Sequence, residues 1–199
     1  MLPLVDFWFL RHGETDWNAQ GLSQGAVDVP LNANGEAQAR RAAELLHEGG
    51  IASIAASSLA RARRTAEIVA AALDLPVRYD PDLREVTFAG KEGQLIGLWY
   101  EDWLSGVATP PGAESFAKLT IRAEAAVTHA LTAPAPVLIV SHGAFFRALR
   151  LAMHLPSNVR TPNAVPIQCT PPPRSQPALP WSLSAPRALS IVGPAGVSG

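Results

Sequence analysis

The sequence predicts an α/β fold, a three-layer α/β/α sandwich with a largely parallel central sheet. Two observations predict this class. Short apolar runs typical of buried strands alternate with segments of helical periodicity over the first 150 residues. Two of these apolar runs also end at a polar segment that contains a histidine. Ligands of parallel α/β sheets bind beyond the carboxyl ends of the strands, so both histidines fall where a site is expected.

The first expected elements are a strand and a helix. Residues 4–10 form a short apolar run of buried-strand type, which stops at the polar residues 11–14. Asn32 can cap a helix, because its side chain can accept a hydrogen bond from an amide of the first turn. We expect that helix to run to about His47, where two consecutive glycines close it.

A second strand and two further helices follow. Residues 51–57 are typical of a strand. Ser58 is the predicted cap of a helix over residues 59–73, in which apolar residues recur on one face. Another helix is expected over residues 114–131.

The last strand and helix carry the second histidine. Residues 137–140 form an apolar strand that ends at Ser141-His142-Gly143. A helix from Ala144 to about Leu155 is expected next. Together these units predict a parallel sheet with helices on both faces.

Two segments are predicted to be irregular. The loop over residues 91–111 contains an aromatic cluster, which could cover the site but which we expect to pack on the sheet: Trp99, Tyr100 and Trp103. Twelve of the 18 prolines follow Ala130, and proline removes a backbone donor and fixes φ. We therefore expect residues 155–199 to be mostly irregular, with short strands near residues 164–169 and 187–192.

Composition limits the class of protein. A chain of 199 residues with 48% hydrophobic and 17% charged residues predicts one domain, residues 1–199, with a sizeable core. The formal charge of −1 provides no field that attracts nucleic acid or an anionic membrane. The single cysteine, Cys169, excludes an intramolecular disulfide and is expected to be buried. The chain has no basic leader and no apolar run of about 20 residues, so we expect a cytoplasmic protein.

Several separated motifs stand in a recognisable order. Residues 11–18, Arg-His-Gly-Glu-Thr-Asp-Trp-Asn, agree with the pattern RHGETxWN at every specified position, and residues 57–66 agree with SxLxRAxQTA except at Arg64. Further agreement lies at residues 24–39, 83–85, 111–116 and 141–143. With these motifs the chain resembles the histidine phosphatase superfamily, or phosphoglycerate mutase-like family, over residues 4–150. The resemblance implies that family's α/β/α fold.

The resemblance also implies phosphoryl transfer and gives five residues a role. His12 would be the nucleophile that becomes phosphorylated, since a neutral imidazole can attack phosphorus when its other nitrogen donates to a fixed acceptor. Arg11 and Arg61 would clamp the phosphoryl oxygens with planar guanidinium forks. His142 would stabilise the transferred charge, and Glu85 would be the general acid and base.

Other site residues and plainer interpretations complete the hypothesis. The expected substrate contacts are Asn18, Ser23, Gln24, Gly25 and Gly143, with Ser23 and Gln24 in a loop of uncertain register. Taken alone, a strand-end histidine can be structural, a helical arginine is usually solvated, and Glu85 could be a surface carboxylate in a loop. Asp82 is the nearest competitor for the role of Glu85.

The predicted function is a metal-independent phosphatase that hydrolyses a small phosphorylated metabolite through a phosphohistidine. No cofactor is implied, and no set of His, Asp and Glu residues has the spacing of metal ligands. One alternative is a phosphoglycerate mutase, but mutases of the family carry an insertion for which the span from Glu85 to Pro111 is short. The other is a non-catalytic module that binds a phosphorylated ligand. The small substrate is the only expected partner, and the oligomeric state is left open, a dimer included.

Overall fold

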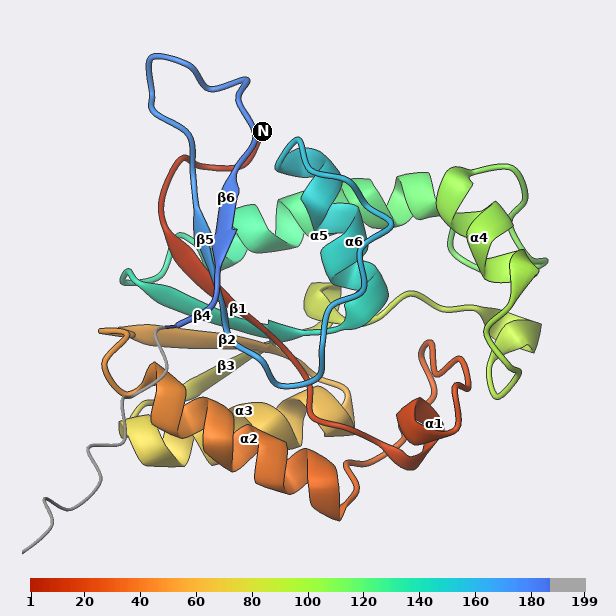
Figure 1. Ribbon diagram of the computed structural model, residues 1–199, viewed down its shortest axis with the longest axis horizontal. Coiled ribbons are helices and arrows are strands. Elements are labelled where there is room, and N and C mark those ends of the chain that lie inside the picture. The colour runs from red at the N-terminus through yellow and green to blue at the C-terminus, as the bar shows by residue number, and fades with distance from the viewer. Residues whose placement is uncertain (187–199) are drawn as a thin grey trace, which may run out of the picture.

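The computed structural model describes residues 1–186 and contains a six-stranded sheet in the order β3-β2-β4-β1-β5-β6 (Figure 1). Pairs β1–β4, β2–β4 and β2–β3 are parallel, whereas β1–β5 and β5–β6 are antiparallel. The strands are β1 (Phe7–Arg11), β2 (Ser53–Ser57), β3 (Val77–Asp80), β4 (Val137–Ser141), β5 (Ile167–Thr170) and β6 (Ser182–Ser184). The predicted α/β class with a largely parallel sheet is confirmed.

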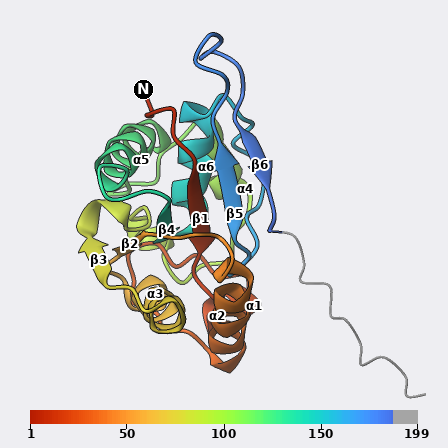
Figure 2. The same cartoon turned by 90° about the vertical axis from the view of Figure 1, so that its left-hand side faces the viewer.

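Helices cover both faces of this sheet. In Figure 1, α2 (Ala33–Leu46) and α3 (Ala60–Leu73) lie below the strands, and α5 (Phe116–Ala130) and α6 (Gly143–Ala152) lie above them. Figure 2 shows β3 and β6 at the two edges of the sheet. The connection between two parallel strands must cross from one end of the sheet to the other, and its helix packs on a face of the sheet. Helices on both faces therefore give three layers.

The central strands show why the sheet is buried on both faces. Phe7 and Phe9 of β1 belong to the cluster formed with α5 and α6, and the Phe9 ring stacks on Phe146 with centroids 4.0 Å apart. Trp8 and Leu10 point the other way, into the cluster formed with α2 and α3. Side chains alternate between the faces of a strand. A strand with helices on both sides therefore reads as a continuous apolar run.

The beginning of α3 differs from the prediction. Ser58 does not cap the helix: α3 begins at Ala60, and the residue at the cap position, Leu59, makes no capping bond with its side chain. Instead the carboxylate of Asp28 accepts a hydrogen bond of 2.6 Å from the Ala60 amide. A cap supplied by a loop 32 residues away leaves no local pattern in the sequence. The cap at Asn32 is confirmed, as its side chain accepts from the Gly35 amide.

Several short elements were not predicted. Within the loop expected at residues 91–111, the structure has α4 (Leu98–Ser105), whose Trp103 is completely buried against Phe88 and Phe116. Trp103 is therefore a core residue, but the contacts that the structure shows join it to Phe88 and to Phe116 of α5 rather than to the sheet as expected. The other additions are α1 (Asp16–Ala19), η1 (Pro81–Leu83), η2 (Ala89–Lys91), β3 and β6. The short helix α1 is stabilised by a capping box between Thr15 and Asn18.

The other predicted elements differ from the structure in their bounds, or lie outside the described residues. Helix α5 begins at Phe116, capped by Ser115, two residues later than expected. Strand β5 overlaps the strand expected near residues 164–169, and Cys169 on it is fully buried, as predicted. The strand expected near residues 187–192 lies outside the described residues. No helix within residues 1–186 is long and apolar enough to cross a bilayer.

Candidate active site

A cavity of about 830 Å³ collects the residues predicted for the site. It is lined by His12 at the end of β1 and by Gly143 at the start of α6, beyond the end of β4. Of the ten residues predicted from the sequence, all but His142 line it: Arg11, His12, Asn18, Ser23, Gln24, Gly25, Arg61, Glu85 and Gly143. His142 lies directly beside it, since its ring centroid is 5.2 Å from that of His12.

The His12 side chain is fixed by a backbone acceptor. Its Nδ1 lies 2.7 Å from the carbonyl oxygen of Gly13, and a carbonyl can only accept, so Nδ1 carries the proton. This tautomer leaves the lone pair on Nε2. Gly13 is itself held by its amide, which donates to Thr65 Oγ1, and a Cβ at Gly13 would lie 2.3 Å from the carbonyl oxygen of Gly35. Only glycine allows the two backbones to approach this closely.

His12 is also kept neutral. Burial lowers its pKa well below the ordinary value, and the positive charges of Arg61 and Arg11 lower the pKa further. A neutral imidazole retains the lone pair that a nucleophile needs. The two arginines therefore both attract an anion to the cavity and keep His12 unprotonated.

The guanidinium groups of Arg61 and Arg11 are held by carbonyl oxygens. Arg61 is fully buried and donates to Val27 O and Gly25 O, both at 2.8 Å. Arg11 donates to Thr161 O at 2.7 Å. Burial lowers the pKa of each arginine to about 10, and Glu85 is the largest charge that opposes this shift. Both side chains stay positively charged at neutral pH, with part of each fork available to a ligand.

Buried polar atoms without a partner are concentrated at this site. Within residues 1–186, five buried side-chain atoms make no hydrogen bond: Arg11 Nε, Ser23 Oγ, Gln24 Oε1, Arg61 Nε and His142 Nδ1. All five belong to residues predicted for the site. Buried polar groups are nearly always satisfied in folded proteins, so a cluster of unsatisfied groups indicates a place for a polar ligand.

The ring of His142 lies next to His12 and is bonded on one side to Ser57. Its Nε2 lies 2.8 Å from Ser57 Oγ, while that oxygen also accepts a bond from the Leu59 amide. Because a hydroxyl can both donate and accept, Ser57 Oγ can pair with either tautomer of His142, and the other ring nitrogen, Nδ1, has no partner among the described residues. Burial, followed by the charge of Arg61, lowers the pKa of His142 well below its usual value. His142 is thus neutral, and its Nδ1 is available to a ligand.

The carboxylate of Glu85 lies at the beginning of α6. Its Oε2 accepts from the Ala144 amide at 3.0 Å, and its Oε1 accepts from the Phe145 amide at 2.9 Å and from the Val86 amide at 3.1 Å. These bonds fix the side chain at the cavity wall. Asp82, the alternative to Glu85, is exposed and does not line the cavity.

The loop of Ser23, Gln24 and Gly25 is held by Glu92. Glu92 Oε1 accepts from the amides of Ala26 and Phe88, which joins this loop to the segment that follows Glu85. Gly25 has φ +51°, and a Cβ there would lie 2.2 Å from Glu92 Oε1. The glycine is therefore required both by its backbone conformation and by the close approach of the carboxylate.

Sequence reasoning missed the contribution of the proline-rich part of the chain. Asn163 Nδ2 donates to the carbonyl oxygen of His12 at 3.0 Å and to Asn18 Oδ1 at 3.2 Å. Thr161 accepts from Arg11, as described above. Tyr100 lines the cavity as well, which is the alternative that the sequence left open for the aromatic cluster; Arg147 and Arg160 also line it. These residues stand singly, and those after α6 lie in irregular chain, so no local pattern could reveal them.

The charge of the site is supplied by side chains. Among the described residues no three His, Cys, Asp or Glu side chains lie together as a metal site would require. The side chains that line the cavity beside His12 include the guanidinium groups of Arg11 and Arg61, which carry positive charge and hydrogen-bond donors. Their arrangement is suited to an anion with several oxygen atoms.

The two buried neutral histidines predict a loss of stability in acid. In the unfolded chain each histidine gains a proton as the pH falls below about 6.5, whereas the lowered pKa values of His12 and His142 keep them unprotonated in the folded state. The unfolded state then binds more protons, so the free energy of unfolding falls by up to about 1.4 kcal/mol per pH unit for each histidine. Urea denaturation between pH 7.5 and 5.5, roughly the range of this titration, measures the slope.

A matched pair of variants isolates this contribution. His12→Gln should reduce the slope below pH 6.5 by up to about 1.4 kcal/mol per pH unit, whereas His47→Gln, at an exposed position, should leave it unchanged. Equal slopes in the wild type and in His12→Gln would mean that His12 is protonated in the folded protein.

Comparisons with known proteins agree with this geometry. A family model described as the histidine phosphatase superfamily (branch 1) matches residues 7–164. A probable phosphoglycerate mutase GpmB of Serratia proteamaculans (strain 568) is 39% identical over 151 residues, covering 70% of this chain and 70% of the relative. The matched range 7–164 contains every residue predicted for the site.

Two solved structures share the fold. A protein described as mycobacterial hydrolase 1 superimposes with a TM-score of 0.78 at 28% identity, covering 90% of this chain and 96% of the other. A mycobacterial glucosyl-3-phosphoglycerate phosphatase in complex with VO3 superimposes with a TM-score of 0.77 at 28% identity, covering 89% and 96% of the two chains.

Proposed function

The chain belongs to the histidine phosphatase superfamily, and from this membership and its cavity we propose a metal-independent phosphatase that acts on a small phosphorylated metabolite through a phosphohistidine at His12. The superfamily includes phosphatases and mutases. The observation that carries the proposal is the group of five buried, unpartnered polar atoms around the neutral His12.

In the first step, Nε2 of His12 attacks phosphorus. A bond forms between Nε2 and phosphorus while the ester bond from phosphorus to the leaving oxygen breaks. Nδ1 keeps its proton and its bond to Gly13 O, which stabilises the positive charge that develops on the ring. Arg11, Arg61 and His142 donate to the three equatorial phosphoryl oxygens, over which the charge is spread in the transition state. Glu85 acts as the general acid and gives a proton to the leaving oxygen.

In the second step, water releases the phosphate. Its oxygen attacks phosphorus, a proton passes from water to Glu85, and the bond between Nε2 and phosphorus breaks. His12 regains its lone pair and Glu85 regains its proton, so both residues return to their starting state. The atoms and charges balance without a metal ion or cofactor.

The short segment between Glu85 and Pro111 favours transfer of the phosphoryl group to water over its return to a substrate. That segment forms only the short turn η2 and the eight-residue helix α4. It contains no larger insertion that would enclose the phosphohistidine. Since one relative is named a probable phosphoglycerate mutase, phosphoryl transfer back to a substrate is the second candidate.

Release of inorganic phosphate tests the proposal. The full chain should hydrolyse para-nitrophenyl phosphate and a panel of phosphorylated metabolites with more than one turnover per protein molecule. Activity should persist in excess chelator, and vanadate should inhibit because it adopts the trigonal-bipyramidal geometry of the transition state. A mutase would instead isomerise its substrate and release little phosphate. Activity that disappears with chelator and returns with a divalent cation would contradict the metal-independent mechanism.

A further inference from the structure

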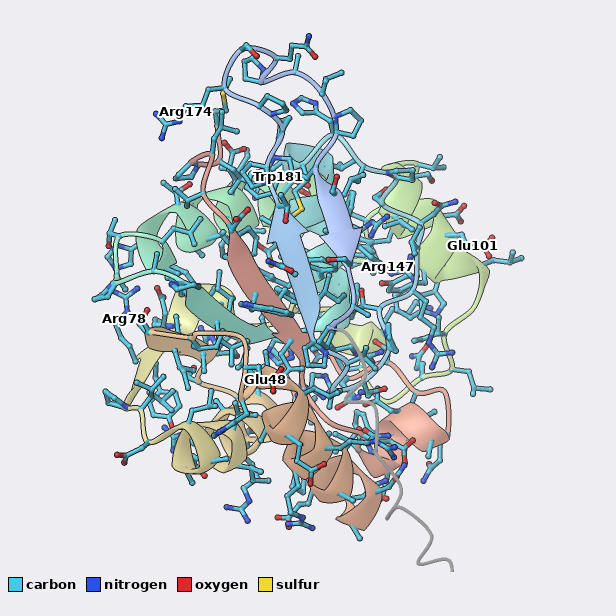
Figure 3. All side chains as sticks on the ribbon, turned by 60° about the vertical axis from the view of Figure 1, so that its left-hand side comes forward. Glu48, Arg78, Glu101, Arg147, Arg174 and Trp181 are labelled. Atoms are coloured by element: carbon cyan, nitrogen blue, oxygen red, sulfur yellow. The ribbon has the colours of Figure 1, made fainter. Side chains whose placement is uncertain are left out.

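The segment between α6 and β5 is bonded to the end of β1 on both sides of Asn163. The Arg11 side chain donates to the carbonyl oxygen of Thr161 at 2.7 Å, and the Ala164 amide donates to the carbonyl oxygen of Arg11 at 2.9 Å. The segment then leads into β5, which pairs antiparallel with β1 and lies beside it in Figure 3. The place of Asn163 in the fold is therefore fixed by its neighbours, without its own side chain.

The side chain of Asn163 joins two oxygen atoms of the site. Its Nδ2 donates to the carbonyl oxygen of His12 at 3.0 Å and to Oδ1 of Asn18 at 3.2 Å. A carbonyl oxygen can only accept, so the atom of Asn163 that faces His12 is the amide nitrogen, and its two protons match its two acceptors. Asn163 is not among the residues that line the cavity. It can act on a ligand there only through another residue.

The side-chain amide of Asn18 is held in one orientation. Its Oδ1 also accepts from the Thr15 amide at 3.3 Å, as part of the capping box of α1. Two donors from distant parts of the chain, Thr15 and Asn163, thus meet the same oxygen, which has two lone pairs. A reversed amide would place its NH2 group against both donors and would lose both bonds.

This orientation leaves the nitrogen of Asn18 available to a ligand. Asn18 lines the cavity, and within residues 1–186 its Nδ2 makes no hydrogen bond. The oxygens of an ionised phosphoryl group are acceptors, so they pair with an N–H donor. A reversed amide would offer them a carbonyl oxygen instead, and two partially negative oxygens repel each other. The orientation of this amide therefore decides whether Asn18 attracts or repels the phosphoryl group.

We infer that Asn163 is a positioning residue, which holds Oδ1 of Asn18 so that Nδ2 of Asn18 donates to the phosphoryl group. The inference rests on the proposed function only in that the ligand of Asn18 is a phosphoryl group. It gives the proline-rich part of the chain a task in the site. That segment supplies one of the two donors that orient the last residue of the motif at residues 11–18.

Nuclear magnetic resonance of the side-chain amides tests this inference in the full chain. Asn18→Ala identifies the cross-peaks of the Asn18 NH2 group by their absence. Saturating inorganic phosphate should move these cross-peaks of the wild type downfield, because a charge-assisted hydrogen bond deshields the donated proton. The shift should be largely lost in Asn163→Leu, whose side chain is similar in size but has no donor. A shift that is absent in the wild type, or unchanged in Asn163→Leu, would overturn the inference.

A double-mutant cycle shows through which residue Asn163 acts. Asn163→Leu alone should weaken the binding of inorganic phosphate by about 10-fold, the scale of one hydrogen bond to a charged group. In the Asn18→Ala background the same change should weaken binding by less than about 2-fold, because the residue that Asn163 orients is absent. Calorimetry measures the four affinities. Losses that add across the two positions would mean that Asn163 acts through the His12 carbonyl or the fold, and would contradict the inference.

Controls separate positioning from folding and from the proposed function. Asn34→Leu removes an exposed amide that donates to Glu14 outside the cavity, and it should change neither the affinity for phosphate nor the shift. If Asn163→Leu does not fold, Asn163→Ala takes its place, and the shift in the wild type needs no variant at position 163. Failure of the wild type to hydrolyse esters would overturn the proposed function, while the binding of inorganic phosphate still tested Asn163.

Discussion

Replacing His12 by alanine is expected to lower the turnover of every phosphate ester by at least about 10⁴-fold, comparable to the loss of a covalent nucleophile in other hydrolases. His12 is a neutral side chain that lines the cavity, and Gly13 O holds its Nδ1 proton, which leaves the lone pair on Nε2. The arginines can still bind the substrate, so KM should change far less than kcat. Steady-state kinetics with para-nitrophenyl phosphate measure both.

Controls separate chemistry from folding. His47→Ala, at an exposed position outside the cavity, should retain the activity of the wild type. The His12→Ala protein should keep its far-UV circular dichroism and should still bind vanadate or phosphate through Arg11 and Arg61. Turnover near the wild-type rate in a folded His12→Ala protein would remove His12 from the mechanism.

The second large effect concerns Glu85 and depends on the leaving group. Glu85→Gln preserves the size of the side chain but removes the proton that it transfers. General acid catalysis contributes about 10²- to 10⁴-fold, so alkyl phosphates should lose this factor. Aryl phosphates with good leaving groups should lose little, since their leaving oxygen needs little protonation. The rate of enzyme phosphorylation by one ester of each kind, measured by rapid quench, gives the comparison.

Two further variants make the comparison specific. Arg61→Met removes a proposed donor to the phosphoryl group, which every ester shares, so both substrates should slow alike. Asp82→Asn, at an exposed position outside the cavity, should affect neither. Equal losses for alkyl and aryl esters in Glu85→Gln would show that Glu85 only shapes the cavity through its bonds to the Ala144 and Phe145 amides.

Much of the fold could be predicted because burial on both faces gives β1 and β4 a strong pattern. Strands β3 and β6 are short edge elements with exposed residues, and α4 is only eight residues long. Elements of this kind depend on tertiary contacts, such as the burial of Trp103, more than on local periodicity. The cap of α3 likewise comes from Asp28 rather than from the adjacent Ser58.

The residues around His12 could be predicted because they lie in dense motifs that follow the ends of strands. His12, Arg61 and His142 are close together in the structure although they are far apart in the sequence, as the parallel sheet requires. The residues that the loop after α6 contributes to the cavity could not be predicted in this way. Arg160 and Asn163 lie in an irregular, proline-rich segment, where only the folded chain shows that it returns to β1.

Trapping the intermediate is the most direct test of a covalent mechanism. Rapid mixing of the wild type with labelled substrate, followed by quenching, should yield a phosphoenzyme that is stable in base and labile in acid, as expected for a phosphoramidate bond. Peptide mapping should place the phosphoryl group on His12, and the His12→Ala protein should carry none. The Glu85→Gln protein should hydrolyse the phosphohistidine more slowly and so accumulate more of it. Steady release of phosphate by the wild type, with no phosphohistidine trapped in either protein, would contradict the account.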